Sequence, residues 1–330
     1  MAVRLDTFSL VSSLYARLNV LVLALGISSF AAAPAHADLL SCEALKKAWS
    51  SISSDASYDE KASLYDQAYN DSDCDGVTVD AFGADIIHSR LDSVVPFDSL
   101  ASHSGNIEEL KETLLDLQEF GEHWRLSYFL GEIYRQQQQV LPALRAYQEA
   151  LGLVDDEELT PNEPDHRMIA RLRDRLDELA VVGAQVSNSP EDVQIPTTRS
   201  GQTISQYSFS TRGYKRKKTL VPIQFKYDQA ILTEAGRLSF QDVRKTLEAQ
   251  GNPDIRVVGH TDPAGSDPYN LDLSLRRAQA IREALLNTGY SGRIDVDGKG
   301  EAQPFRFDDP SLYSEDLRNQ AHRRVEFVRN

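Results

Sequence analysis

Sulfur-containing residues and catalytic motifs are scarce in this chain of 330 residues. Two cysteines and two methionines are too few for a disulfide-rich scaffold or a cysteine-based zinc cluster. The chain also contains no HExxH, no CxxC pair and no GxSxG turn, the patterns that place a metal or a nucleophile in an active site. We therefore expect no enzymatic activity, no metal site and no cofactor.

Long apolar runs are also missing. The best candidate, Leu18–Phe30, is shorter than the roughly 20 residues that a membrane-spanning helix needs. Arginines precede it, and small residues at Ala35 and Ala37 follow it. This order predicts a signal peptide over residues 1–37, cleaved after Ala37. An uncleaved inner-membrane anchor is the alternative, because the segment before the apolar run is unusually long.

Basic residues are scarce in the first half of the chain. Asp38–Gly183 carries 30 acidic and 12 basic residues, whereas Ala184–Thr219 carries 2 and 6, and Leu220–Asn330 carries 17 and 15. The formal net charge of the whole chain is -15. An acidic first half argues against nucleic acid or an anionic membrane surface as its direct partner.

The two cysteines, Cys42 and Cys74, flank two segments with helical patterns, Cys42–Ser51 and Tyr58–Tyr69. An exported chain with an even number of cysteines favours a disulfide between them. Closing a loop of this length stabilises a fold by about 3–4 kcal/mol in the chain-entropy model. The alternative is lipidation of Cys42, since the preceding LLS resembles a weak lipobox; Cys74 would then be unpaired.

Residues 38–183 have a helical apolar pattern, with no run of alternating strands. One unit, Tyr128–Leu153, resembles a tetratricopeptide repeat. The positions at the spacing of that family are Leu130, Gly131, Tyr134, Ala143, Tyr147 and Ala150. The aromatic residue at the first position of the repeat is absent, because Ser127 stands there. The resemblance implies a protein-docking groove, and a plain helical bundle with a buried aromatic core is the alternative.

Further helices are expected on both sides of this unit. Ile107–Phe120 has a helical pattern, and Arg167–Val182 carries Ile169, Leu172, Leu176 and Leu179 at helical spacing. Asp165 can serve as the N-cap of this last helix. Residues 184–219 then lose hydrophobic periodicity and are rich in Ser, Thr, Pro and Gln, which predicts a linker.

The predicted linker ends in the basic run 215–218. Three interpretations of this run stay open: docking within the chain, contact with a phosphate-bearing lipid surface, or a solvated flank of the next strand.

Residues 220–330 alternate strand and helix patterns, which predicts a βα-sandwich with a mixed sheet. The expected elements are strand Leu220–Tyr227, helix Leu232–Ala249, strand Ile255–Gly259, helix Pro268–Asn287, and strands Arg293–Gly298 and Val325–Val328.

A candidate site follows the strand Ile255–Gly259, because ligands of open α/β sheets gather at the carboxyl ends of strands. Asp262 lies there, and Asp267 with Pro268 predicts a capped helix start. Asn270, Ser274 and Arg277 then fall on one stripe of the helix. The adjoining face should pack on the sheet through Leu271, Leu275, Ala278 and Leu285.

A carboxylate and a guanidinium at a fixed spacing suit a small zwitterion, because Asp262 can bind an ammonium and Arg277 can grip a carboxylate with two hydrogen bonds. A salt bridge between the two side chains is the alternative interpretation of the same spacing.

The region 220–330 closely resembles OmpA-like peptidoglycan-binding domains. The shared motifs are Thr261-Asp262, Gly265, Asn270, Leu273-Ser274, Arg277-Ala278, Gly298-Lys299-Gly300-Glu301 with Pro304, and Arg323-Arg324-Val325-Glu326. The resemblance implies that Asp262 and Arg277 bind diaminopimelate of the stem peptide, and that Asp228, Asn270, Thr261 and Arg323 line the same pocket. His322 replaces an asparagine of the terminal motif.

The resemblance implies a protein that binds peptidoglycan non-covalently, and with the predicted signal peptide we expect it in the periplasm, associated with the cell wall or outer membrane. Its helical half is expected to dock an envelope protein. No integral membrane barrel is expected, because the alternating strands that a barrel requires are absent before residue 220. The alternatives are an inner-membrane-anchored stator or secretion-machine component that binds the wall, and an envelope hydrolase.

Overall fold

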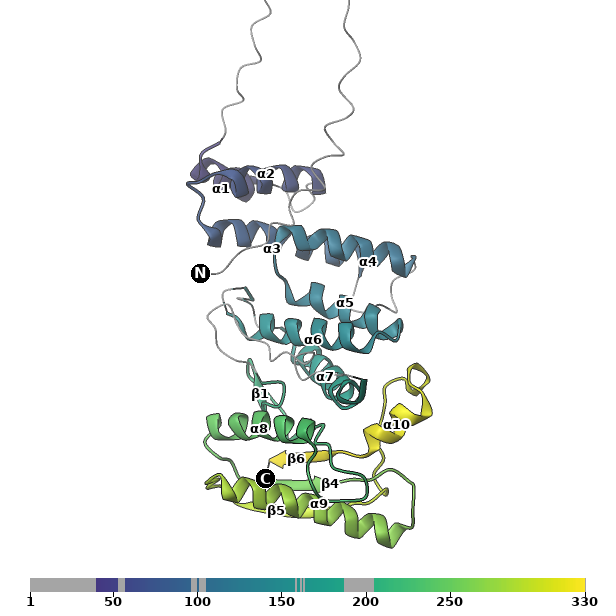
Figure 1. Ribbon diagram of the computed structural model, residues 1–330. Helices are drawn as coiled ribbons and strands as arrows, with labels where there is room; N and C mark the ends of the chain where they lie inside the picture. The colour runs from purple at the N-terminus through teal and green to yellow at the C-terminus, as the bar shows by residue number, and fades with distance from the viewer. Residues whose placement is uncertain are drawn as a thin grey trace, which may run out of the picture. The chain divides into compact units, whose positions relative to one another are not determined.

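The computed structural model describes residues 40–52, 57–95, 100, 105–157, 159–160, 162, 164–186 and 205–329 (Figure 1). Residues Ser41–Asn330 form one compact unit. The predicted signal peptide over residues 1–37 lies outside the described residues, as does the stretch 187–204 of the predicted linker.

The first part of this unit is helical, as its apolar pattern predicts. Its helices are α1 (Cys42–Ser51), α2 (Tyr58–Asn70), α3 (Gly76–Val94), α4 (Ile107–Asp116), α5 (Trp124–Gln136), α6 (Val140–Asp155) and α7 (His166–Val186), with a 3-10 turn at Leu117–Phe120. Asp165 caps α7 as predicted, because its carboxylate accepts the Arg167 N–H at 2.7 Å. Among the described residues, no helix is long and apolar enough to cross a membrane.

A disulfide joins Cys42 at the start of α1 to Cys74 in the turn before α3, so the predicted pairing is present in the structure. Close by, Trp49 of α1 stacks on Phe82 of α3, with ring centroids 4.0 Å apart. The disulfide and the stacked rings fasten the first three helices to one another.

Helices α5 and α6 pack closely, because Gly131 faces the ring of Tyr147. A β-carbon at Gly131 would lie 2.8 Å from that ring, so a larger residue would push the helices apart. The buried Tyr147 hydroxyl donates to Glu132 at 2.8 Å. The pair fits the sequence pattern of Tyr128–Leu153, while its tetratricopeptide identity stays a prediction.

The second part contains a four-stranded mixed sheet with the strand order β3-β6-β4-β5. Its strands are β3 (Lys218–Val221), β4 (Ile255–Gly259), β5 (Ile294–Gly298) and β6 (Val325–Arg329). Strands β4 and β5 are parallel, and β6 is antiparallel to both of its neighbours. The first strand is shorter than predicted. It ends before Pro222, which has no N–H to donate, and Phe225 makes only an isolated bridge to Leu232.

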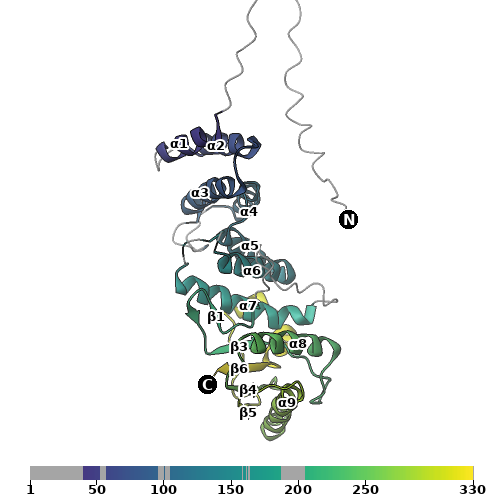
Figure 2. The same cartoon turned by 90° about the vertical axis from the view of Figure 1, so that its left-hand side faces the viewer.

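The two faces of the sheet have different neighbours. Val257 and Phe327 lie on the face that packs against α8 (Glu234–Ala249) and α9 (Asp267–Asn287) (Figure 2). Leu220, Val258 and Glu326 are paired in register and alternate to the opposite face. Leu220 there contacts Val181 of α7, so the opposite face of the sheet lies toward the last helix of the helical part.

The described part of the predicted linker, residues 205–219, is structured. Strands β1 (Ser210–Thr211) and β2 (Tyr214–Lys215) form a small hairpin. Tyr207 and Phe209 are buried in the same core as α8 and α9, because burying two aromatic rings outweighs the polar composition of the segment. A boundary between independent domains at 184–219 stays a prediction.

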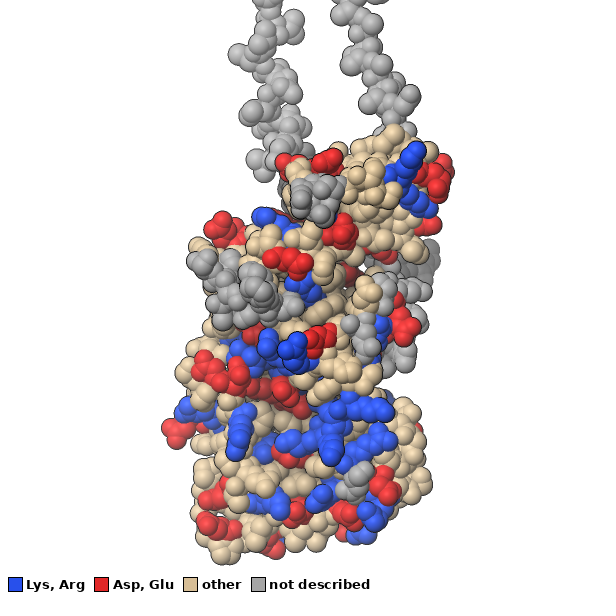
Figure 3. Space-filling model, turned by 180° about the vertical axis from the view of Figure 1, so that it is seen from behind, with Lys and Arg blue, Asp and Glu red and all other residues tan. Residues whose placement is uncertain are grey.

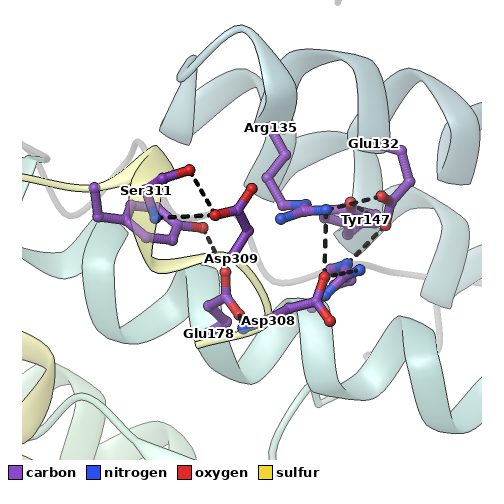
Figure 4. Close-up of polar contacts among 9 residues, drawn as sticks. Glu132, Arg135, Tyr147, Glu178, Asp308, Asp309 and Ser311 are labelled. Carbon is purple, nitrogen blue, oxygen red and sulfur yellow. Dashed lines mark hydrogen bonds and ion pairs between the residues drawn. The ribbon is translucent and has the colours of Figure 1, made fainter. Parts of the chain in front are cut away.

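A polar cluster connects the helices to the segment before α10 (Glu315–His322). Arg175 of α7 contacts Glu132 of α5 at 2.7 Å and Asp308 at 2.8 Å. The buried carboxylate of Glu178 accepts the Tyr313 hydroxyl at 2.6 Å and the Asp308 N–H at 3.2 Å (Figure 4). We call these contacts the clasp.

Candidate ligand-binding site

The candidate site lies where β4 ends and α9 begins. Two glycines bring the helix against the sheet at this point. A β-carbon at Gly259 would lie 2.1 Å from the Ser274 carbonyl oxygen, and one at Gly298 would lie 2.6 Å from the Leu275 nitrogen. Both contacts are with helix backbone, so neither position tolerates a side chain without moving α9. The polar residues of α9 are thereby held close to the strand ends.

Asp262 is mostly covered, with 16% of its side chain exposed. One carboxylate oxygen accepts the Ala264 N–H at 3.1 Å, and the other accepts from the guanidinium of Arg323. The predicted alternative, a salt bridge from Asp262 to Arg277, is therefore not the pairing in this structure. A 40%-exposed Arg323 side chain supplies the partner, and solvent or ligand can reach this ion pair.

Arg277 is 6% exposed, and among the described residues no carboxylate forms an ion pair with it. Its Nε donates to the Gln229 carbonyl at 3.2 Å, and its guanidinium lies 5.2 Å from the Phe225 ring centroid. Burial and the neighbouring Arg323 lower the pKa of Arg277. The carboxylates of Asp262 and Asp228 act in the opposite direction and offset a part of this decrease. A buried cation without a counter-ion is costly, and an anionic ligand would supply what the fold leaves out.

Asn270 and Thr261 lie beside this pair. The buried Asn270 amide donates to Glu301 at 2.5 Å and to the Asp262 carbonyl at 3.4 Å. The Thr261 N–H donates to Gly300 at 2.9 Å, whereas its buried hydroxyl has no hydrogen-bond partner among the described residues. Buried hydroxyls are normally paired, so Thr261 offers a further contact for a ligand.

Asp228 reaches the site from the turn after Phe225. Its φ of 56° lies in the left-handed region, which Asp tolerates better than most residues. The Asp228 carboxylate accepts from the hydroxyl of Tyr269, and its charge acts on Arg277. The turn therefore brings a second carboxylate to the guanidinium from outside α9.

Two details of the predicted helix are wrong. The N-cap of α9 is Ser266, and Asp267 is its first residue, so the helix begins one position earlier than predicted. Leu271 is 52% exposed rather than packed on the sheet, and the polar residues Asn270, Ser274 and Arg277 are buried instead. The buried face is thus rotated toward the polar stripe, because Ser274 fills the space left by the glycines and accepts the Gly300 N–H at 2.9 Å.

Sequence reasoning missed three participants: Tyr269, Phe225 and Glu301 as side-chain partners of Asp228, Arg277 and Asn270. The sequence did hold a signal for Tyr269. It directly precedes Asn270 in the first turn of the predicted helix, and residues of that turn lie close to the same strand ends. Glu301 stands in the shared motif that begins at Gly298, but its contact with Asn270 is tertiary, as is that of Phe225 with Arg277, and no local pattern encodes these contacts.

Neither His322 nor His260 forms a hydrogen bond or ion pair with the described residues of the candidate site. The His322 ring nitrogen accepts the Phe305 N–H at 3.0 Å. His260 is buried beside Glu326, with 3.6 Å between the nearest nitrogen and oxygen. Within the described part of the chain, no group of His, Cys, Asp and Glu is arranged to hold a metal ion. The site combines an anion-accepting guanidinium with a cation-accepting carboxylate.

Comparison with known proteins relates the part of the chain that holds the candidate site to a protein family. Residues 224–312 match the OmpA family, so the chain carries an OmpA-family domain toward its C-terminus. Outer membrane porin F of Pseudomonas aeruginosa is 32% identical over 84 residues, which is 25% of this chain and 24% of that protein. Outer membrane protein A of Bordetella avium is 35% identical over 81 residues, which is 24% of this chain and 42% of that protein. The chain thus spans less than half of the length of these relatives.

Solved structures are similar to about a third of this chain, among them the following two. The cell wall anchor of the T6SS from Pseudomonas aeruginosa is 24% identical, with a TM-score of 0.27, over 34% of this chain and 78% of that one. The peptidoglycan-associated lipoprotein from Burkholderia pseudomallei is 23% identical, with a TM-score of 0.28, over 35% of this chain and 91% of that one.

Proposed function

We propose that this protein binds peptidoglycan without covalent attachment, through the diaminopimelate residue of the stem peptide. The observation that carries the proposal is the buried guanidinium of Arg277, which has no counter-ion from the described chain. It lies beside Asp262, Asp228 and Arg323, in a domain of the OmpA family.

Each charged group then has a part of the ligand to bind. The end of a diaminopimelate side chain carries an ammonium and a carboxylate on one carbon. Arg277 takes the carboxylate in a bidentate contact, and Asp262 takes the ammonium while it stays in contact with Arg323. A wall with lysine in this position has the ammonium alone and would leave Arg277 buried and unpaired, which discriminates against it.

The neighbouring residues complete the pocket. Asn270 and the unpaired Thr261 hydroxyl supply hydrogen bonds to the ligand backbone. Asp228 and Arg323 lie at the exposed rim and contact the remaining amide and carboxylate groups. None of these side chains is arranged as a nucleophile with an adjacent base, so the proposed activity is binding, and purified protein is expected not to turn over muropeptides.

The proposal places the protein in the periplasm, at the cell wall or the outer membrane, where relatives named outer membrane proteins share the domain. The helical part, with its tetratricopeptide-like pair α5–α6, would dock an envelope protein and hold it near the wall.

A pulldown with two kinds of peptidoglycan tests the function. Wild type should bind the diaminopimelate type and bind the lysine type about tenfold or more weakly, a difference of about 1.4 kcal/mol per tenfold. Asp262→Asn and Arg277→Lys should each reduce binding to the diaminopimelate type by about tenfold or more, because each removes a charge-assisted or bidentate contact.

Arg276→Gln is the matched control. Arg276 neighbours Arg277 in sequence but is exposed and pairs with Asp272 at 2.7 Å, so its loss should leave binding within about twofold. Undiminished binding by both site variants would refute the assignment of the site.

A further inference from the structure

A basic groove lies outside the candidate site, between α7, the extended segment 214–218 and the loop 302–308. Its volume is ≈ 1210 Å³, and ten of its lining residues are Lys or Arg whereas five are Asp or Glu. Seen from behind, the side chains of Lys and Arg gather into one band on the molecular surface (Figure 3). Such a concentration is unusual here, because the chain as a whole has a net charge of -15.

Part of this lining is fixed by ion pairs within the chain. Arg216 contacts Asp177 of α7 at 3.0 Å, and Arg324 contacts Glu326 of β6 at 2.8 Å. Burial alone would raise the pKa of Glu326, but its contacts with His260, Arg324 and Lys218 hold that pKa at about 2. These paired residues make rigid walls, and their charges are already balanced.

Three exposed cations in the groove have no such partner among the described residues. Lys215, Lys217 and Arg306 line it, are exposed, and form no ion pair with any described residue. Lys215 ends β2, and Lys217 lies two residues on, at the bend before β3, so their backbones are at most roughly 7 Å apart. Arg306 belongs to the loop on the other side. Acidic side chains also line the hollow, among them the exposed Asp174 and Asp308, but the basic residues outnumber them.

We propose that this basic groove binds an extended, acidic polypeptide segment of a partner protein. Side chains two residues apart on an extended peptide lie roughly 7 Å apart, which is the upper bound on the backbone separation of Lys215 and Lys217. Carboxylates are also the groups that the arginines of the groove already hold, at Asp177, Glu326 and Asp308. The acidic segment would thus form the same kind of contact, a carboxylate with a basic side chain, that the lining arginines already form within the chain.

Shape and charge separate this occupant from other polyanions. A planar bilayer presents its phosphates as a surface, which does not enter a hollow, whereas a single extended chain does. A nucleic acid has a high density of negative charge along its whole length, so the acidic helices of the same chain would repel it. None of the candidate wall-binding residues lines the groove, so this proposal stands independently of peptidoglycan binding.

Fluorescence anisotropy with defined peptides tests the groove on the purified protein. The probe is a labelled peptide of alternating Glu and Ser, and the matched peptide has Gln in place of Glu. We expect saturable binding of the acidic peptide alone, weakened by salt because the contacts are exposed and screened. The triple variant Lys215→Gln, Lys217→Gln, Arg306→Gln should bind it roughly tenfold or more weakly.

The control variant removes the same charge elsewhere. Lys47, Lys245 and Arg256 are exposed and lie outside the groove, and their replacement by Gln should leave peptide binding within about twofold. Equal thermal midpoints of the two triple variants show that both fold.

Three results would overturn the proposal: failure of the acidic peptide to bind, equal loss in both triple variants, or binding of vesicles of phosphatidylcholine and phosphatidylglycerol in place of the peptide. Salt-sensitive self-association that the groove variant abolishes would instead assign the groove to a second copy of the chain. Retained wall binding by the groove variant distinguishes this test from that of the candidate site.

Discussion

At the scale of single residues, two buried guanidiniums, neither of them in an ion pair with a described residue, differ in the hydrogen bonds that the fold gives them. Arg173 donates to the Gln206 carbonyl at 2.9 Å and to the hydroxyl of Thr211, so its position is satisfied by the fold. Among the described residues, Arg277 has one hydrogen bond, to the Gln229 carbonyl, and no carboxylate partner. The first arrangement belongs to a structural arginine. The second is the arrangement that the proposed ligand-binding role of Arg277 requires.

Replacing each of these arginines by methionine should separate the two roles. Arg173→Met should lower the free energy of unfolding by about 3 kcal/mol or more, because it leaves buried carbonyls unpaired. Arg277→Met should change it by less than about 1 kcal/mol or increase it, since a poorly compensated buried charge is removed. Urea denaturation measures both values. A large loss in Arg277→Met would mean that Arg277 serves the fold.

His123 gives the helical part a dependence on pH. Its ring nitrogen accepts the Arg125 N–H at 3.2 Å and so caps α5. Burial and the nearby side chains of Arg125 and His88 lower the pKa of His123 to about 4. Asp92 acts in the opposite direction and offsets a part of this decrease. An unfolded histidine titrates near 6.5. The unfolded state therefore binds the proton more readily, and stability falls as pH drops from about 6.5 toward 4, by at most about 3 kcal/mol.

The variant His123→Asn should remove this contribution, because asparagine caps a helix without titrating. Urea unfolding at several pH values between 7.5 and 4 is the measurement, with the difference between wild type and variant as the readout. His166→Asn, at an exposed position, should keep the wild-type slope. A constant difference between wild type and His123→Asn over this range would contradict the assignment.

At the scale of helices and strands, the sequence predicts most elements, because their periodicity is local. Helices α1, α5, α6 and α9 and strand β4 follow from apolar spacing. The contacts that shape the site are not local. Asp262 and Arg323 are 61 residues apart, so motif spacing could suggest both as site residues but not that they form the ion pair. The length of β3 depended on one residue, Pro222, whose missing N–H ends the ladder.

Close packing of α9 on the sheet should depend on Gly259. In Gly259→Ala the added carbon would lie 2.1 Å from the Ser274 carbonyl oxygen, so the helix must move, at a cost of about 1–3 kcal/mol. The shift displaces Arg277, and we expect weaker binding of diaminopimelate-type peptidoglycan as well. Gly76→Ala is the control, because nothing lies within 4 Å of its added carbon. Equal stability of both variants in urea would show that the close approach is unimportant.

At the scale of the whole molecule, α7 belongs to two cores. Ile169, Leu172 and Leu176 pack into the helical core, together with Tyr313 from the segment before α10. Val181 of the same helix packs with Leu220 of β3. With the clasp added, the helical part and the OmpA-family domain share buried surface and buried hydrogen bonds. A partner held by the helices, as proposed, would then be fixed in orientation relative to the candidate site.

This sharing predicts cooperative unfolding of residues Ser41–Asn330. Calorimetry of wild type should give a single transition whose calorimetric and van't Hoff enthalpies agree. Tyr313→Ala removes a buried ring and the hydroxyl bound to Glu178, at a cost of about 3–5 kcal/mol by analogy with other large aromatic residues. Because that loss falls on the contact between the two parts, we expect two transitions in this variant, with the helical part and the OmpA-family domain unfolding separately.

Ser311→Ala provides the comparison. Among the described residues, the Ser311 hydroxyl bonds only to Asp309, at an exposed position, so this variant should leave one transition at nearly the wild-type midpoint. Tyr313→Phe separates the ring from the hydroxyl: loss of the hydrogen bond to the Glu178 carboxylate alone should cost about 1.5–3 kcal/mol without splitting the transition. Two transitions already present in wild type, or a single one kept in Tyr313→Ala, would mean that the clasp does not couple the two parts. The helical part would then unfold independently of the OmpA-family domain, and the clasp would not fix the orientation of a bound partner relative to the candidate site.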